Sequence, residues 1–395
     1  MEINTIAEYR KKYHEKLNEG ISDLHKIAEI PTTSPSYTVK YSHGDQTMLA
    51  ASDESGEVYI ISIAGDSSVS ISSQFRAHHN SIFDTSWSFD DTKLLTASGD
   101  LTGMVWDLER KESETLVGHG GSIKCIKSVP NTREVYATAA RDGFIYFWDA
   151  RCPGKINENR TEHEPVGFIT GKHKETGKKN RIQQGSTIGF TGIEFLGNHL
   201  IASVEQNEAS VKIWDIRKIM GGKGNKKKPV NYAAKIDPWT WRRTQMSHDI
   251  STKIYGQDFY KTYDLFNKEE QNRELSVGNS WISLSPNGVS LMVSSLKNVV
   301  YVYKNLNTLD IEPPIQLIGH RASFYVKGCF SSQSTHVVSG SLDGPMFIWD
   351  TEKPDEPWRV ITGHVTETNS VDWSSGSSLF LASTSDDCCV NIWDF

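Results

Sequence analysis

The sequence has 395 residues, of which 37% are hydrophobic, 23% charged and 10% aromatic, a composition that excludes a disordered chain and can bury one large core. The net charge of −7 excludes a general attraction to nucleic acids or anionic membranes, so we expect no direct sequence-specific nucleic-acid binding. No apolar run is long enough to span a bilayer and no secretory leader is recognisable, which predicts a soluble intracellular protein without a membrane partner.

The first predicted element is an amphipathic helix within residues 1–24. Ile6, Tyr9, Tyr13 and Leu17 recur at spacings of three and four residues, as the apolar side of a helix requires. Two roles remain open for this helix: it covers one face of the following domain, or it inserts into a groove of a partner.

The remaining residues, 25–395, contain an internal repeat of about 40 residues. Alternating apolar runs end in a Trp-Asp pair at Trp106, Trp148, Trp214, Trp349 and Trp393, and weaker copies cover residues 37–63 and 279–303. Seven such units predict an all-β fold, a seven-bladed WD-repeat β-propeller preceded by the short N-terminal helix. The last unit has only three strands before Phe395, so we expect residues 25–30 to supply its fourth strand and close the ring.

Four blades share a set of polar residues at fixed spacing. A His stands 28 or 29 residues before the Trp, an Asp stands six residues before it, and a Ser usually stands two residues before that Asp. The sets are His78, Ser98, Asp100 and Trp106; His119, Asp142 and Trp148; His320, Ser341, Asp343 and Trp349; and His364, Ser385, Asp387 and Trp393. The predicted hydrogen-bond chain runs from the carboxylate through the imidazole and the hydroxyl to the indole. We interpret these sets as structural anchors, because a catalytic Ser-His-Asp triad occurs once whereas this set recurs with the repeat.

Two insertions interrupt the repeat, at about 152–186 and 218–276. Both contain basic runs, for which solvated loops, a nuclear localisation signal and a phosphate contact all remain open. The second insertion also places Trp239 and Trp241 beside Arg242 and Arg243, which is typical of an interface anchor or of a tryptophan pair packed on its own blade.

The sequence contains no pattern that predicts catalysis. We find no phosphate-binding glycine loop and no nucleophile elbow, and the five cysteines have no C-x-x-C spacing. We therefore predict a non-enzymatic platform for binding proteins, with no catalytic residue, cofactor or metal.

Several strings within the blades resemble the denticleless-type proteins, substrate receptors of the cullin-4 ubiquitin ligase. They are AHHNSIFDTSW (77–87), RDGFIYFWDARC (141–152), VKIWDIRK (211–218) and GHRASFYVKGCFS (319–331). The resemblance implies binding to the ligase's damage-binding adaptor through W-D-x-R boxes on consecutive blades. Two adjacent boxes match, Trp148-Asp149-Ala150-Arg151 and Trp214-Asp215-Ile216-Arg217, whereas Glu109 and Glu352 stand at the Arg position of two other blades.

The resemblance further implies a nuclear protein whose partners are degron-bearing substrates presented on DNA-loaded PCNA. Such a receptor brings replication and cell-cycle proteins to ubiquitination in S phase or after DNA damage. Since the sequence ends with its last blade, we do not expect a C-terminal PCNA-binding peptide. The alternative is a WD-repeat scaffold without a ligase, in a nuclear chromatin or RNA-processing complex.

Overall fold

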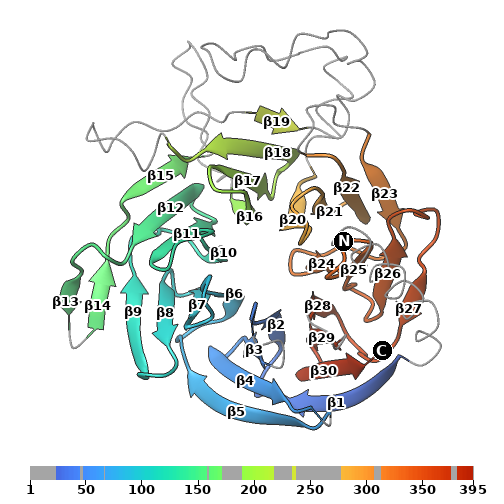
Figure 1. Ribbon diagram of the computed structural model, residues 1–395, viewed down its shortest axis with the longest axis horizontal. Helices are drawn as coiled ribbons and strands as arrows, with labels where there is room; N and C mark the ends of the chain where they lie inside the picture. The colour runs from blue at the N-terminus through green and yellow to red at the C-terminus, as the bar shows by residue number, and fades with distance from the viewer. Residues whose placement is uncertain are drawn as a thin grey trace, which may run out of the picture.

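The computed structural model describes residues 24–44, 48–65, 67–157, 160–170, 189–217, 234–236, 277–306, 313–374 and 380–394. In this part of the chain, seven sheets surround a central axis, which confirms the predicted seven-bladed, all-β propeller (Figure 1). None of these residues belongs to a helix long and apolar enough to cross a membrane. The helix predicted within residues 1–24 lies outside the described residues, which begin at Leu24.

Each blade contains antiparallel strands that follow one another outward from the axis. Blade 1 contains β2 (Ser36–Tyr41), β3 (Met48–Asp53), β4 (Glu57–Ile63) and β5 (Val69–Arg76). Blade 2 contains β6 (Ile82–Trp87), β7 (Lys93–Ser98), β8 (Gly103–Asp107) and β9 (Glu112–Leu116). Blade 3 contains β10 (Ile123–Ser128), β11 (Val135–Ala140), β12 (Phe144–Asp149) and β15 (Gly167–Thr170).

The second half of the ring follows the same order. Blade 4 contains β16 (Phe190–Leu196), β17 (Leu200–Glu205), β18 (Glu208–Asp215) and β19 (Ala234–Ile236). Blade 5 contains β20 (Asn279–Leu284), β21 (Leu291–Ser295), β22 (Val299–Tyr303) and β23 (Ile315–Ile318). Blade 6 contains β24 (Gly328–Phe330), β25 (His336–Ser339), β26 (Met346–Asp350) and β27 (Arg359–Ile361). Blade 7 contains β28 (Thr368–Trp373), β29 (Phe380–Ser385) and β30 (Cys389–Asp394).

The fourth strand of blade 7 comes from the other end of the described chain. Strand β1 (His25–Pro31) pairs antiparallel with β30, with Ile30 opposite Val390. Ile30 belongs to one buried cluster with Tyr59 and Ile61 of blade 1 and Ile392 of blade 7. The strand therefore completes the last sheet and also joins it to the first (Figure 1).

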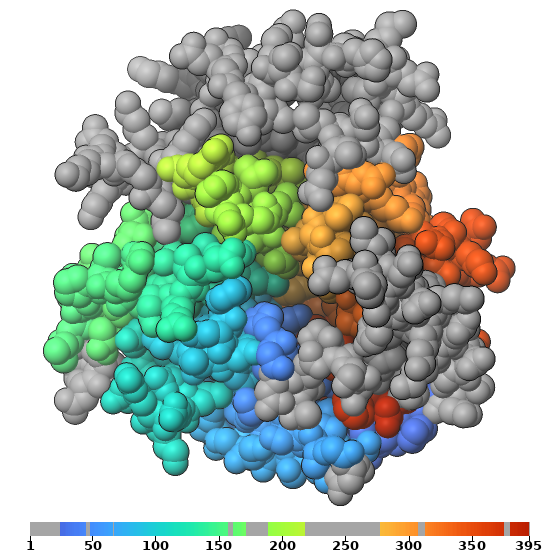
Figure 2. Space-filling view, viewed as in Figure 1, coloured from blue at the N-terminus to red at the C-terminus, as the bar shows by residue number. Residues whose placement is uncertain are grey.

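The core of the propeller lies between the blades, because both faces of each sheet are covered by a neighbour. Trp148 of blade 3 packs with Leu95 and Val105 of blade 2, and Trp349 of blade 6 packs with Val300 of blade 5. Burying such a large side chain contributes roughly 2–3 kcal/mol. The tryptophan that ends the third strand thus fixes its blade to the preceding one, and the blades lie side by side around the ring (Figure 2).

The first insertion, predicted over about 152–186, contains regular structure in its first half. β13 (Lys155–Asn157) and β14 (Arg160–His163) form a hairpin, and β14 runs parallel to β9 and extends blade 2. β15, also in this segment, is the outer strand of blade 3. The outer edge of a four-stranded blade has free backbone groups that an added strand can pair. Residues 171–188 and most of the second insertion, with its tryptophans, lie outside the described residues.

Candidate functional site

The two ends of the blades form two different faces of the ring. At the upper face, the innermost strands begin and the second strand turns into the third, as between Ser98 and Gly103. At the lower face, the third strands end in Trp-Asp pairs such as Trp148-Asp149. The His-Asp sets and the W-D-x-R arginines therefore lie on opposite faces.

In blade 2, four side chains form a continuous hydrogen-bond chain beneath the upper face. His78 Nδ1 lies 2.9 Å from Asp100 Oδ2, and His78 Nε2 lies 2.8 Å from Thr96 Oγ1. The indole N–H of Trp106 donates to the same hydroxyl at 3.2 Å. Burial alone raises the pKa of Asp100, but the hydrogen bond and charge of His78 outweigh burial and hold that pKa well below its usual value.

Blades 3 and 7 repeat this geometry. In blades 2 and 7 the hydroxyl is not that of the predicted serine, and in blade 3, for which no hydroxyl was predicted, Thr138 supplies it. The corresponding chains are Asp142, His119, Thr138 and Trp148, and Asp387, His364, Ser383 and Trp393. Ser98, the last residue of β7, donates to Ser81 O at 3.0 Å and accepts the Asp100 N–H at 3.2 Å. Ser385 makes the equivalent bond to Asp387 N. These serines therefore stabilise the turn. The hydroxyl that accepts the indole N–H belongs to a residue nearer the centre of the second strand.

Blade 6 has the predicted residues but not the predicted chain. Asp343 is half-exposed, and its carboxylate lies 2.9 Å from Nη1 of Arg321, the residue that follows His320. Ser341 accepts the Arg321 N–H, and the Trp349 indole donates to the Ile318 carbonyl. Neither ring nitrogen of His320 has a hydrogen-bond partner among the described residues. Burial lowers the pKa of this imidazole to about 4.

Blade 4 replaces the missing His with a buried lysine that the sequence pattern did not indicate. Lys212 Nζ lies 2.5 Å from Glu205 Oε1 and 2.9 Å from Glu208 Oε2, and Glu208 occupies the Asp position six residues before Trp214. Burial lowers the pKa of Lys212, but the two carboxylates outweigh burial and raise it overall. Trp214 donates to Ser203 Oγ at 2.8 Å.

These differences predict unequal effects of removing the four turn aspartates. Asp100→Ala, Asp142→Ala and Asp387→Ala each leave a buried imidazole without its acceptor, so each should lower the free energy of unfolding by ~1–3 kcal/mol. Asp343→Ala removes only a surface pair and should cost about 0.5 kcal/mol or less. Urea denaturation of the four variants measures this. An Asp343→Ala variant as unstable as the other three would contradict the assignment.

At the lower face, two arginines project from adjacent blades in the same conformation. Arg151 Nε and Nη2 lie 2.8 and 2.7 Å from the two carboxylate oxygens of Asp149. Arg217 Nε and Nη2 lie 2.9 and 2.6 Å from those of Asp215. The arginine side chains are 67% and 60% exposed, while the preceding Trp148 and Trp214 are buried. Each box thus holds one guanidinium at the surface in a defined orientation.

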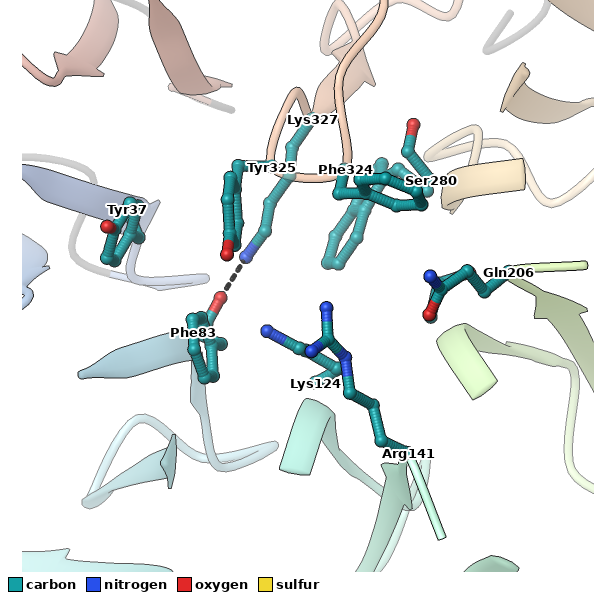
Figure 3. Close-up of a pocket in the computed structure, with 11 residues that line it drawn as sticks. Tyr37, Phe83, Lys124, Arg141, Gln206, Ser280, Phe324, Tyr325 and Lys327 are labelled. Carbon is teal, nitrogen blue, oxygen red and sulfur yellow. Dashed lines mark hydrogen bonds between the residues drawn. The ribbon is translucent and has the colours of Figure 1, made fainter. Parts of the chain in front are cut away.

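At the upper face, residues from blades 1 to 6 line a pocket at the mouth of the central channel, which we call the mouth pocket. Tyr37, Phe83 and Tyr325 form an aromatic cluster with ring centroids 5.1–6.0 Å apart (Figure 3). Lys124 Nζ lies 3.0 Å from the centre of the Phe83 ring. The sequence pattern did not reveal this pocket as a site, although the string that carries the resemblance supplies Phe324, Tyr325 and Lys327.

No group of three or more His, Cys, Asp or Glu residues that could hold a metal ion occurs in the described parts of the chain. The buried carboxylates of the blade anchors already bond to imidazoles or ammonium groups of their own blade.

Comparison with known proteins identifies the repeat and several related proteins. The family model "WD domain, G-beta repeat" matches residues 69–107, 110–149, 312–350 and 355–394. The chain is 28% identical to the Denticleless protein homolog of Gallus gallus, over 88% of this chain and 45% of that protein. It is 29% identical to the Denticleless protein homolog B of Xenopus laevis, over 89% of this chain and 46% of that protein. It is 24% identical to the Protein lethal(2)denticleless of Drosophila melanogaster, over 95% of this chain and 46% of that protein.

The chain spans about half the length of the curated relatives it matches. The family model matches blade 3, whose Trp148-Asp149 pair begins the first W-D-x-R box, and does not match blade 4, which carries the second box. The chain therefore contains WD repeats and, over most of its length, is similar to the denticleless proteins.

Proposed function

We propose that this chain is the substrate-recognition subunit of a nuclear cullin-4 ubiquitin ligase. Its lower face binds the damage-binding adaptor of the ligase. Its upper face recruits replication and cell-cycle proteins, presented on DNA-loaded PCNA, for ubiquitination and degradation in S phase or after DNA damage.

The observation that carries this proposal is the matched geometry of Arg151 and Arg217. Both are exposed on adjacent blades, and each is held in one orientation by the aspartate two residues before it. A guanidinium fixed in this way loses little side-chain freedom when it meets carboxylates or carbonyls of a partner. Similarity to the denticleless proteins supports the adaptor as that partner.

The separation of the two faces also supports a receptor role. The mouth pocket and four exposed apolar side chains, Leu101, Phe324, Leu342 and Val365, belong to upper-face loops and turns. A partner bound at Arg151 and Arg217 leaves these groups accessible. One ring can therefore bind the ligase and a substrate at the same time.

We expect the double variant Arg151→Ala/Arg217→Ala to lose adaptor binding while keeping the fold. Its affinity for the damage-binding adaptor should fall about tenfold or more, because two charge-assisted contacts are lost. Co-precipitation from nuclear extract, affinity measurement with the purified adaptor and a melting curve check the result.

The matched control is Arg110→Ala/Arg133→Ala, which removes two exposed arginines from the same face outside the boxes. This control should capture the adaptor as the unmodified protein does. Unchanged capture by the Arg151/Arg217 variant contradicts the role of the boxes. Absence of adaptor and cullin-4 from the partners of the unmodified protein favours the scaffold without a ligase.

A further inference from the structure

The mouth pocket combines positive charge with aromatic surface, and the blade architecture does not use that charge. Lys124, near the start of β10, points across the mouth towards Phe83, and Arg141 reaches the same space from the turn between β11 and β12 (Figure 3). Within the described residues, neither Lys124 nor Arg141 forms an ion pair with a carboxylate. Two basic side chains thus converge on one opening without a carboxylate partner among the described residues.

A third cation is present but already has partners. Lys327 Nζ contacts Asp84 Oδ1 at 3.0 Å and the Phe83 carbonyl oxygen, and it lies 4.5 Å from the centre of the Trp281 ring. Asp84 also accepts the Ile126 N–H at 3.0 Å, so its carboxylate is fully engaged below the mouth. Lys327 therefore fixes the pocket wall and adds to the positive field.

We infer that the mouth pocket binds an anionic side chain of an extended substrate peptide, a carboxylate or a phosphate, between Lys124 and Arg141. This inference extends the proposed receptor role. It rests on that role in one respect, since only a receptor would bind the peptide as a substrate. Exposed Phe324, Leu342 and Val365 on the same face favour a peptide with neighbouring apolar side chains over a free anion. The net charge of −7 disfavours a nucleic acid as the occupant.

Lys124 makes binding sensitive to pH in a defined direction. Burial, followed by the charges of Arg141 and Lys327, lowers the pKa of Lys124 to about 6 in the empty pocket. A bound anion stabilises the ammonium form, so binding takes up a proton. The groups that face Lys124 are Arg141, Lys327 with its partner Asp84, and the Tyr325 ring. Affinity for a carboxylate should therefore fall as pH rises above 6.

The test uses biotinylated heptapeptide pools that share a fixed central residue: Glu, phosphoserine, Gln or Lys. The flanking positions are random but contain no acidic residue. At pH 6 the propeller should retain the Glu and phosphoserine pools about tenfold better than the Gln pool, as expected for one charge-assisted contact. The comparison of the first two pools decides between carboxylate and phosphate. Equal retention of the Glu, phosphoserine and Gln pools, or preference for the Lys pool, overturns the inference.

Three variants locate the site. Lys124→Met and the more exposed Arg141→Met should each reduce the preference for Glu over Gln, whereas Arg133→Met on the lower face should not. Between pH 6 and pH 8, retention of the Glu pool by the unmodified protein should fall about tenfold, and Lys124→Met should abolish this dependence. A preference that survives in both pocket variants overturns the inference. Stronger retention of a single-stranded oligonucleotide, lost in the same variants, overturns it in favour of nucleic acid.

Adaptor capture separates this site from the proposed ligase role. Lys124→Met and Arg141→Met should bind the damage-binding adaptor as the unmodified protein does, because their side chains lie on the opposite face. If the unmodified protein binds no adaptor but shows the Glu preference, the receptor role fails and the anion site stands. If it binds adaptor but shows no preference, only the anion site fails.

Discussion

Lys212→Ala is expected to destabilise the propeller more than the loss of any of the four turn aspartates. The lysine side chain is 1% exposed and that of Glu205 2%, and Lys212 also contacts Glu208. Removal of the ammonium leaves a buried carboxylate without its counter-charge, which costs about 3–5 kcal/mol. Urea denaturation should show this loss, and at 37 °C part of the protein should be unfolded.

Two further variants show whether the effect comes from the unpaired charge. Lys212→Met/Glu205→Gln/Glu208→Gln removes the whole charge cluster and should recover most of the stability, because no buried charge remains unpaired. Lys155→Ala, which breaks the exposed pair with Glu164, should leave the denaturation midpoint unchanged. If Lys212→Ala is no less stable than Lys155→Ala, the buried pair does not hold blade 4.

The second large effect is a loss of folding stability at acidic pH. His320 is 2% exposed, and burial lowers the pKa of its imidazole to about 4 from an unfolded value near 6.5. The unfolded chain therefore binds a proton that the folded state excludes, so stability is complete above pH 6.5 and falls as pH decreases towards 4. This difference corresponds to roughly 3 kcal/mol over that window.

His320→Phe should remove this part of the pH dependence. Phenylalanine keeps an aromatic ring beside Trp349, whose ring centroid lies 5.9 Å from that of His320. Unfolding free energies of the variant between pH 7 and pH 4.5 should fall less steeply than those of the unmodified protein. His79→Phe, at an exposed position on the same face, should keep the original slope. Identical slopes for His320→Phe and the unmodified protein would show that the acid sensitivity has another origin.

The features that could be predicted from the sequence depend on contacts within a single repeat. His78 and Asp100 are 22 residues apart within one repeat, so regular spacing alone brings them together in blade 2. The same spacing occurs in blade 6, but there Asp343 forms an ion pair with Arg321 and does not bond to His320. Sequence spacing predicts which side chains come near one another, but competition between neighbours decides which of them bond.

Long-range contacts explain what the sequence did not reveal. Lys327 and Asp84 are 243 residues apart, and only closure of the ring brings them to one side of the channel. Lys212 was missed because a lysine two residues before the Trp-Asp pair is ordinary in such a strand, and only the absence of the repeat's His from blade 4 gives it significance. The hairpin of β13 and β14 was missed because residues 155–163 lack the alternation that marked the other strands.

The pairing of β1 with β30 has a consequence for how the protein is made. β30 is the last described strand to leave the ribosome, and until then Leu49, Tyr59 and Ile61 of blade 1 lack the cover of Val390 and Ile392. Contacts between segments so distant in sequence form slowly, and exposed apolar strands aggregate readily. The ring therefore closes only after β30 has been synthesised, and until then part of the apolar surface of blade 1 is exposed.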